Sequence, residues 1–176
     1  MIERINIPAD RVRVLLSRRS YLEKESKARL DVTMDGEVIV DGDDALLIYR
    51  CLQVIKAIGR GFAPIKAERL FDDRFYLRIF DIRDFSGKSR NRSIELKGRI
   101  IGRNGKARRT IEESTDCYLS VYGHTVSIIG SYPAMESAER AAEMLLEGSE
   151  HSVVFSFLRK EKTRRIKEEL MNKNEQ

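Results

Sequence analysis

The chain of 176 residues repeats one pattern of turns, strands and helices, and this duplication limits the folds that it can adopt. Three turn glycines recur with offsets of 87, 88 and 89 residues: Gly36 with Gly123, Gly42 with Gly130, and Gly59 with Gly148. Such a nearly constant offset indicates two copies of one structural unit whose loops differ slightly in length. A chance alignment of hairpin turns is the alternative, because glycine turns are common.

Hydrophobic periodicity predicts the same element order, β-α-α-β-β-α, in both copies. In the first copy we expect a strand over 2–7, helices over 8–16 and 21–28, a hairpin over 30–40 and a helix over 44–58. In the second copy we expect a strand over 75–85, helices over 93–101 and 106–114, strands over 119–121 and 126–129, and a helix over 133–146. The predicted fold class is therefore α+β, with two three-stranded sheets that are each backed by three helices.

The predicted division of the chain follows this repeat. The first domain would span residues 1–70 and end in a short connecting helix, and the second would span 71–150. Residues 151–176 would form an apolar docking segment and then a charged helix that frays near Gln176.

A short glycine-containing loop stands between the first two helices of the second copy. The run reads Ile100-Ile101-Gly102-Arg103-Asn104-Gly105-Lys106, and we call residues 102–105 the glycine loop. Because glycine has no Cβ, a sugar-phosphate backbone can approach the main chain closely there. The amides at the start of the following helix would add partial positive charge at the same place.

Basic residues are concentrated around the glycine loop. The net charge of +5 and the pI near 9.3 favour polyanionic partners only if the charge is localised. Between residues 86 and 110 lie nine basic residues and one acid: Lys88, Arg90, Arg92, Lys97, Arg99, Arg103, Lys106, Arg108 and Arg109, against Glu95. This distribution predicts a phosphate-binding surface.

Taken with its surroundings, the motif resembles the GxxG loop of KH domains, which hold about four nucleotides of single-stranded RNA. The resemblance implies an apolar cleft floor beside the loop, with charged residues on the phosphates. The RNA-binding residues predicted in this way are Ile100, Ile101, Gly102, Arg103, Asn104, Gly105, Lys106, Arg108, Arg109, Ile111, Leu119 and Val121. Arg108 departs from the KH pattern, because an aliphatic residue usually stands three positions after the second glycine.

The first copy has Ser17-Arg18-Arg19-Ser20 at the position aligned with the glycine loop, 85 residues earlier. A serine side chain at each end would obstruct the close approach of a phosphate backbone. A left-handed conformation at serine would also cost about 1 kcal/mol or more per residue. We therefore expect little or no RNA binding there, and a solvated turn or a protein-contact surface is favoured.

Longer stretches resemble archaeal double-KH proteins, which are similar to the eukaryotic small-subunit assembly factor called partner of Nob. They are the run Ala57-Ile58-Gly59-Arg60-Gly61-Phe62 with Pro64, Ala67 and Leu70, the run 98–105, and the strands from Ser120 to Gly130. The resemblance implies two tandem type I KH domains, of which the second binds the 3′ region of small-subunit ribosomal RNA. It also implies a Nob-type endonuclease and a ribosomal RNA dimethyladenosine transferase as partners through the first domain, and no catalytic activity or cofactor.

The same residues give little support to an enzyme. Asp72-Asp73 lacks a third acid or histidine at a useful spacing for a metal, and neighbouring acids on a helix do not share a face, so a nuclease is disfavoured. A tandem-KH factor of transcription, the exosome or translation remains the alternative. Cys51 and Cys117 are expected to be buried thiols. No signal peptide or long apolar run is present, which favours a cytoplasmic protein outside membranes.

Overall fold

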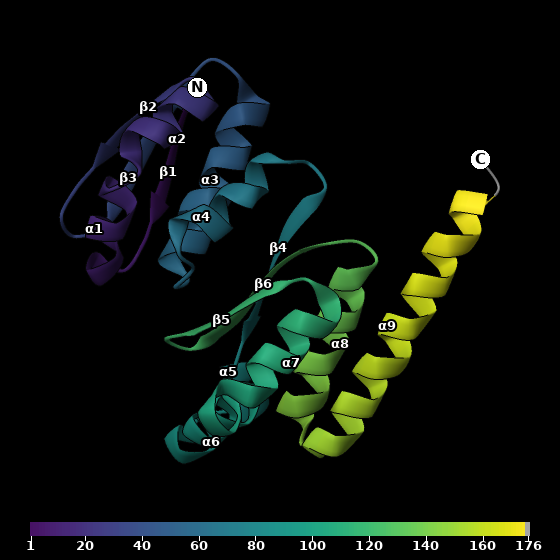
Figure 1. Cartoon of the computed structure of the whole chain (residues 1–176). Coiled ribbons are helices and arrows are strands. Elements are labelled where there is room, and N and C mark those ends of the chain that lie inside the picture. Colours follow the sequence, from purple (N-terminus) through teal and green to yellow (C-terminus); the bar gives the residue numbers. More distant parts are fainter. Residues whose placement is uncertain (175–176) are drawn as a thin grey trace. The chain divides into compact units, whose positions relative to one another are not determined.

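Each half of the chain folds around a three-stranded sheet in the computed structural model, which describes residues 1–174 (Figure 1). The chain divides into two compact units between Leu77 and Arg78, within the strand β4 (Phe75–Asp81). The predicted class, a mixed α+β chain with two three-stranded sheets, is confirmed. The fraying predicted near Gln176 lies outside the described residues.

The first unit has the predicted element order. Its elements are β1 (Ile2–Asn6), α1 (Ala9–Leu16), α2 (Arg19–Ser26), β2 (Ala28–Val32), β3 (Glu37–Gly42), α3 (Ala45–Gly59), α4 (Pro64–Ala67) and the 3-10 helix η1 (Glu68–Phe71). The sheet order is β1-β3-β2, and β3 is antiparallel to both neighbours. Alternate residues of the hairpin are buried, namely Leu30, Val38 and Val40, because one sheet face packs on the helices.

The second unit repeats this order and adds helices. Its elements are β4 (Phe75–Asp81), α5 (Arg83–Ser86), α6 (Arg90–Ile101), the 3-10 helix η2 (Arg103–Gly105), α7 (Lys106–Thr115), β5 (Tyr118–Tyr122), β6 (Thr125–Ser131), α8 (Ala134–Glu147) and α9 (His151–Asn174). The sheet order β4-β6-β5 is equivalent to that of the first unit. The core includes side chains from the sheet, from α6, α7 and α8, and from α9.

The strand predicted over 75–85 is shorter than expected. It ends at Asp81, whose carboxylate accepts hydrogen bonds from the backbone amide and the guanidinium of Arg83, at 2.9 Å each. This bonding turns the chain into α5, as aspartate commonly does at a turn. The following helix also starts earlier than predicted, at Arg90, because the Ser89 hydroxyl accepts from the Arg92 amide at 3.2 Å.

Equivalent contacts recur in the two units. The Glu23 carboxylate accepts a hydrogen bond from the backbone amide of Leu30 at 2.9 Å. The Glu112 carboxylate accepts one from the backbone amide of Leu119, also at 2.9 Å. Glu23 and Glu112 are 89 residues apart in the sequence, and so are Leu30 and Leu119. The same helix is therefore tied to the same strand in both units.

Two of the repeated glycines are explained by close approach of neighbouring strands. A Cβ on Gly42 would lie 2.9 Å from the Cβ of Ala28, and a Cβ on Gly130 would lie 2.3 Å from the Sγ of Cys117. Both distances are shorter than real contacts between such atoms. Each hairpin therefore requires glycine at this position.

The loop alignment predicted from the sequence is wrong in detail. Helices α1 and α6 end at Leu16 and Ile101, which are 85 residues apart, whereas Glu23 and Glu112 in the next helices are 89 apart. Counted as far as these glutamates, the second unit has four more residues, two of them in the connection between the helices and two in the first part of α7. Only Ser17 and Arg18 connect α1 to α2, so the first unit has no structural counterpart of the whole glycine loop.

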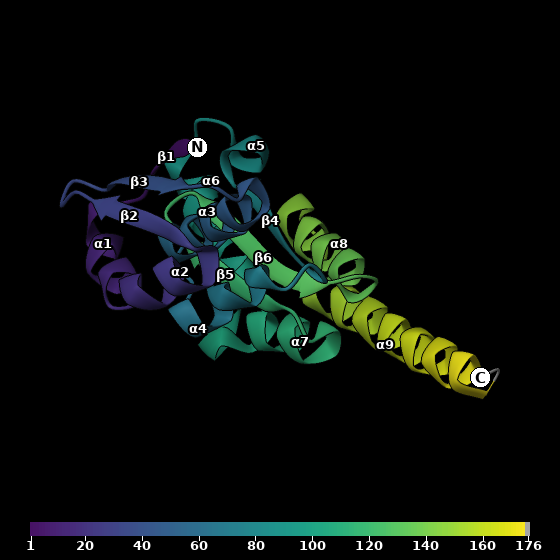
Figure 2. The same cartoon turned by 90° about the horizontal axis from the view of Figure 1, so that it is seen from above.

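The predicted docking segment and charged helix form one continuous helix, α9. Val154 and Leu158 are buried in the core, and the buried Arg165 guanidinium donates to the Ser137 hydroxyl at 2.7 Å and to the Ser114 carbonyl at 2.5 Å. Helix α9 therefore lies along α7 and α8 and extends beyond α8 at its C-terminal end (Figures 1 and 2). Among residues 1–174, no helix has the length and apolar character required to span a membrane.

The two cysteines are free and buried, as predicted. Burial raises the pKa of the Cys51 thiol to about 11 and also raises the pKa of the Cys117 thiol. Because the thiolate is the reactive form, both thiols are unreactive in the folded protein near neutral pH.

The start of α3 provides a test of the fold. The Asp44 carboxylate caps this helix by accepting from the amides of Leu46 and Leu47, at 3.0 and 3.1 Å. We expect Asp44→Ala to lower the free energy of unfolding by about 1 kcal/mol, measured by urea denaturation. Asp43→Ala is the matched control, because Asp43 is exposed and does not cap the helix. Equal effects of the two substitutions would contradict the capping role.

Candidate nucleic-acid interface

The glycine loop has a backbone conformation that few residues other than glycine adopt. Its φ and ψ angles are 73° and 172° at Gly102, 52° and 29° at Asn104, and 74° and 15° at Gly105. The conformation of Gly102 is essentially restricted to glycine, and asparagine is one of the side chains that tolerate the left-handed region best. The local sequence Gly-Arg-Asn-Gly therefore matches the turn that it forms.

The two glycines of the loop have different roles. A Cβ on Gly102 would lie 2.7 Å from both the backbone nitrogen and the Cβ of Ala107, so this glycine permits the end of α6 to pack against the first turn of α7. A Cβ on Gly105 would meet nothing within 4 Å. Gly105 thus faces open space, where another molecule can approach the main chain.

The loop leads directly into the N-terminus of α7. Gly105 is the N-cap residue, and no side chain caps the first amides of this helix. These amides and the helix dipole favour an anion at this end. Arg103 and Lys106 flank the same place, and both are exposed without an ion pair among residues 1–174.

Other basic residues of the predicted cluster are engaged within the protein. The Arg99 guanidinium donates to the carbonyl of Leu145, at 3.0 Å, and to that of Ser149, so it supports the end of α8. Arg92 forms an ion pair with Glu95 at 2.8 Å. The charge available to a ligand is therefore smaller than the sequence cluster indicates.

Arg108 and Arg109 lie on the exposed part of α7 near the loop. Arg108 pairs with Glu112 at 3.5 Å, and Arg109 donates to the carbonyl of Asn104 at 3.2 Å. The second contact places a guanidinium beside the glycine loop and stabilises it.

The apolar residues predicted for the cleft floor fall into two groups. Ile100, Ile111 and Leu119 are within the core, with at most 3% of their surface exposed. Ile101 is 39% exposed, and Val121 is partly buried. In this structure only Ile101 and Val121 offer surface to a base, and the three buried residues support the loop from below.

Two residues that were not predicted lie beside the glycine loop. His151 and Phe155, one turn apart on α9, line a cavity of about 360 Å³ together with Gly102, Arg103, Lys106 and Ala107. We call these six residues the aromatic pocket. The sequence indicates an apolar segment at 153–158. Because about fifty residues separate this segment from the loop, the sequence alone does not predict that the two lie side by side.

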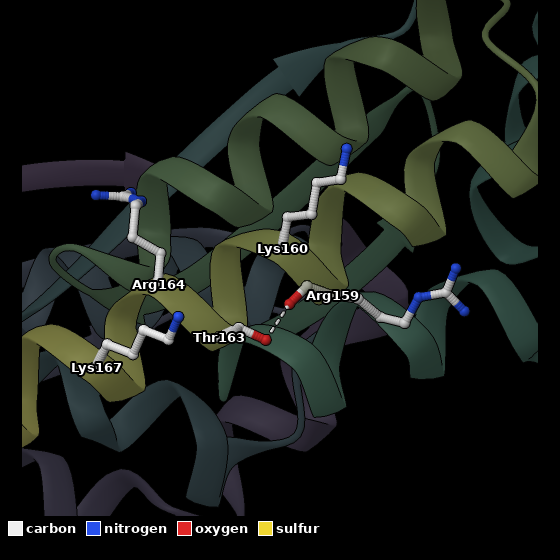
Figure 3. Close-up of a pocket in the computed structure, with 5 residues that line it drawn as sticks. All are labelled: Arg159, Lys160, Thr163, Arg164 and Lys167. Carbon is white, nitrogen blue, oxygen red and sulfur yellow. Dashed lines mark hydrogen bonds between the residues drawn. The ribbon is translucent and has the colours of Figure 1, made fainter.

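A basic face lies farther along α9 (Figure 3). It consists of Arg159, Lys160, Thr163, Arg164 and Lys167. The Arg164 guanidinium bonds to Glu161 at 2.7 Å and to Glu168 at 3.0 Å, and its hydrogen bond lowers the pKa of the Glu161 carboxyl. Lys160 and Lys167 form no ion pair in the described part of the chain. This face is more basic than most of α9, but its central arginine is neutralised.

The corresponding turn of the first unit has its arginines occupied. Arg18 donates twice to the Glu68 carboxylate, at 2.6 and 2.9 Å, and lies 4.7 Å from the centre of the Tyr21 ring. Arg19 bonds to Glu23 at 3.1 Å. No residue of this turn has a positive φ. The turn therefore lacks the features that make the glycine loop open to phosphate.

Within residues 1–174, no group of three or more His, Cys, Asp or Glu side chains is arranged to hold a metal ion. The acidic pair Asp72-Asp73 is instead used in contacts with arginine, since Asp72 pairs with Arg74 at 2.5 Å and Asp73 with Arg50 at 3.8 Å.

The chain is similar in sequence to known KH-domain proteins. Residues 76–163 match the model of the eukaryotic-type KH domain, KH-domain type I. A KH domain-containing protein of Methanocaldococcus jannaschii is 40% identical over 98% of this chain and 80% of its own length.

Solved structures from other archaea have the same fold. A protein of unknown function from Aeropyrum pernix is 33% identical with a TM-score of 0.89, covering 98% of this chain and 96% of its own. Dim2p from Pyrococcus horikoshii is 35% identical with a TM-score of 0.83, covering 91% and 99%. The same organism's complex of a/eIF2alpha, aDim2p and rRNA contains a chain that is 35% identical, with a TM-score of 0.85 and coverages of 93% and 95%.

The different roles of the two loop glycines can be tested by substitution. We expect Gly102→Ala to lower the free energy of unfolding by about 2–4 kcal/mol, because the new Cβ would both strain the backbone and overlap Ala107. Gly105→Ala should cost only about 1–2 kcal/mol, since it strains the backbone but enters open space. Chemical denaturation would measure both, and a larger loss for Gly105→Ala would contradict the packing role of Gly102.

Proposed function

Because the chain belongs to the eukaryotic-type KH-domain family (KH-domain type I), we propose that it binds single-stranded RNA through the glycine loop. The observation that carries this proposal is the open main chain at Gly105, which stands at the uncapped N-terminus of α7 between two unpaired cations. Backbone amides, a helix dipole and nearby basic side chains form a suitable site for consecutive phosphates.

The proposed contacts divide by type. Arg103, Asn104 and Lys106 are exposed around the loop and would bind phosphates, which provide affinity and register. Ile101 and Val121 would contact bases. Ile100, Ile111 and Leu119 would hold the loop in position from the core, and Arg108 and Arg109 would extend the charged rim.

We further propose that the RNA is small-subunit ribosomal RNA near its 3′ end and that the protein acts in ribosomal RNA processing. Support comes from the relative that occurs in a complex with rRNA and from the resemblance to the partner of Nob family. In this proposal both units are KH domains, over 1–70 and 71–150, and residues 151–176 form a C-terminal extension.

The first domain is proposed to bind protein instead of RNA. Its arginines are paired with carboxylates, and its helices are joined by a two-residue turn. Candidate partners are a Nob-type endonuclease and a ribosomal RNA dimethyladenosine transferase. A role in translation is the second candidate, because a relative occurs in a complex that also contains a/eIF2alpha.

The proposed activity is binding without catalysis. Incubation of the pure protein with labelled RNA and Mg²⁺ should leave the RNA intact. Cleavage that persists through stringent purification, and that is lost together with RNA binding on mutation of the glycine loop, would instead favour a nuclease.

The loop can be tested by charge reversal. Arg103→Asp combined with Asn104→Asp should weaken RNA binding by about 100-fold or more, because two contacts are replaced by repulsion of phosphate. The fold should persist, since aspartate tolerates the left-handed conformation of residue 104. Fluorescence anisotropy with labelled single-stranded RNA would measure the affinity, and thermal unfolding would measure the fold.

A charge-matched control is available in the first unit. Arg13→Asp combined with Ser20→Asp changes the net charge by the same amount on exposed residues. This variant should bind RNA nearly as well as the wild-type protein. If the two double variants lose affinity equally, binding depends on overall charge and the glycine loop is not the site.

The identity of the RNA can be tested in cells. Crosslinking the protein and sequencing the attached RNA should enrich the 3′ region of small-subunit ribosomal RNA, and the Arg103→Asp, Asn104→Asp variant should lose this enrichment. Enrichment of unrelated messenger RNA, or co-sedimentation with polymerase or exosome instead of small-subunit precursors, would contradict the ribosomal assignment.

A further inference from the structure

We propose that the aromatic pocket binds one additional unpaired nucleobase, adjacent to the phosphates at the glycine loop, and so extends the RNA site onto α9. This inference rests on the proposed function. It concerns the side of the glycine loop that faces α9, whereas the cleft predicted from the sequence lies on the side of β5.

The pocket shares its wall with the phosphate site. Gly102, Arg103 and Lys106 belong both to the glycine loop region and to the lining of the cavity. A nucleotide whose phosphate is bound at the loop would therefore have its neighbouring base next to the cavity. The volume of about 360 Å³ is within the range of small-ligand sites.

The aromatic side chains provide a stacking surface. Phe155 is partly buried, packs against the core and has its ring centre 6.0 Å from that of His151, at an interplanar angle of 61°. Its ring is therefore held by its neighbours while part of it remains exposed in the cavity. Stacking of bases on such rings is a principal contribution to single-stranded RNA binding.

The His151 imidazole is oriented by a hydrogen bond at one ring nitrogen. Its Nε2 is 2.8 Å from the carbonyl oxygen of Arg99, and because a carbonyl only accepts, Nε2 must carry a hydrogen. No hydrogen bond to Nδ1 is found among residues 1–174. The imidazole is thus oriented by its contact with Arg99, and Nδ1 remains available to the edge of a base.

The combination of groups favours a nucleotide over a peptide or an apolar ligand. Two cations without an ion pair, an exposed main chain and an aromatic ring surround one cavity, and among the described residues 1–174 no acidic side chain lines it. A peptide would not need the phosphate site beside the pocket. The basic face of Figure 3 is also on α9, but its lining comes from α9 alone. The aromatic pocket, in contrast, includes residues of the glycine loop.

Oligouridylates and oligoadenylates of four to eight nucleotides are suitable probes. The wild-type protein should gain affinity when the RNA is extended beyond the four nucleotides held by the loop. Phe155→Leu, which retains an apolar side chain but removes the ring, should abolish that gain and weaken binding of the longer RNAs about 5- to 150-fold. Phe155→Tyr should bind like the wild type.

Abasic substitutions separate stacking from support of the fold. In the longer RNA, removal of the one base that occupies the pocket should weaken binding to the wild-type protein about 5- to 150-fold. Removal of the same base should not weaken binding to Phe155→Leu any further. Val153→Ala is the matched control, because Val153 is 52% exposed on the same helix and does not line the pocket. Thermal unfolding would confirm that each variant is folded.

The outcomes distinguish the two proposals. If the Arg103→Asp, Asn104→Asp variant loses binding but Phe155→Leu matches the wild type at every length, the pocket assignment is overturned and the proposed function stands. If Phe155→Leu weakens all lengths equally with no sensitive base position, Phe155 only supports the loop and the assignment is also overturned. If reversal of the loop charges has no effect, the proposed function itself fails.

Discussion

The close approach of Gly102 to Ala107 is the contact on which the candidate site depends. It brings the end of α6 against the first turn of α7, and the intervening residues must then turn through left-handed conformations. As a result, Gly105 is open to solvent, the first amides of α7 are uncapped, and Arg103 and Lys106 flank them. A side chain at residue 102 would disturb all of these features together.

The two units show how a duplicated fold can keep its core and differ in its site. The bonds of Glu23 and Glu112 to their strands are equivalent, and the hairpin glycines meet equivalent neighbours. The glycine loop lies outside these shared contacts, in a connection between two helices that is two residues longer than in the first unit. Because the core does not require a longer connection, the first unit folds with a turn of two residues.

Local pairing, more than composition, determines where charge is available. Arg99 supports the end of α8, Arg92 and Arg108 pair with carboxylates, and Arg109 bonds to the loop backbone. On α9, Arg164 is similarly held between two glutamates. A basic sequence is therefore an incomplete guide to a binding surface, since paired cations offer less attraction to phosphate than unpaired ones.

The sequence by itself determined the repeat, the element order, the buried cysteines and the position of the glycine loop. These features depend on local requirements, such as hydrophobic periodicity and backbone angles that only glycine adopts readily. Tertiary structure alone decided that Ile100, Ile111 and Leu119 are buried in the core, and that His151 and Phe155 lie beside a loop about fifty residues earlier. Periodicity identifies the apolar face of a helix, but only the packing of distant segments decides which residues of that face remain exposed.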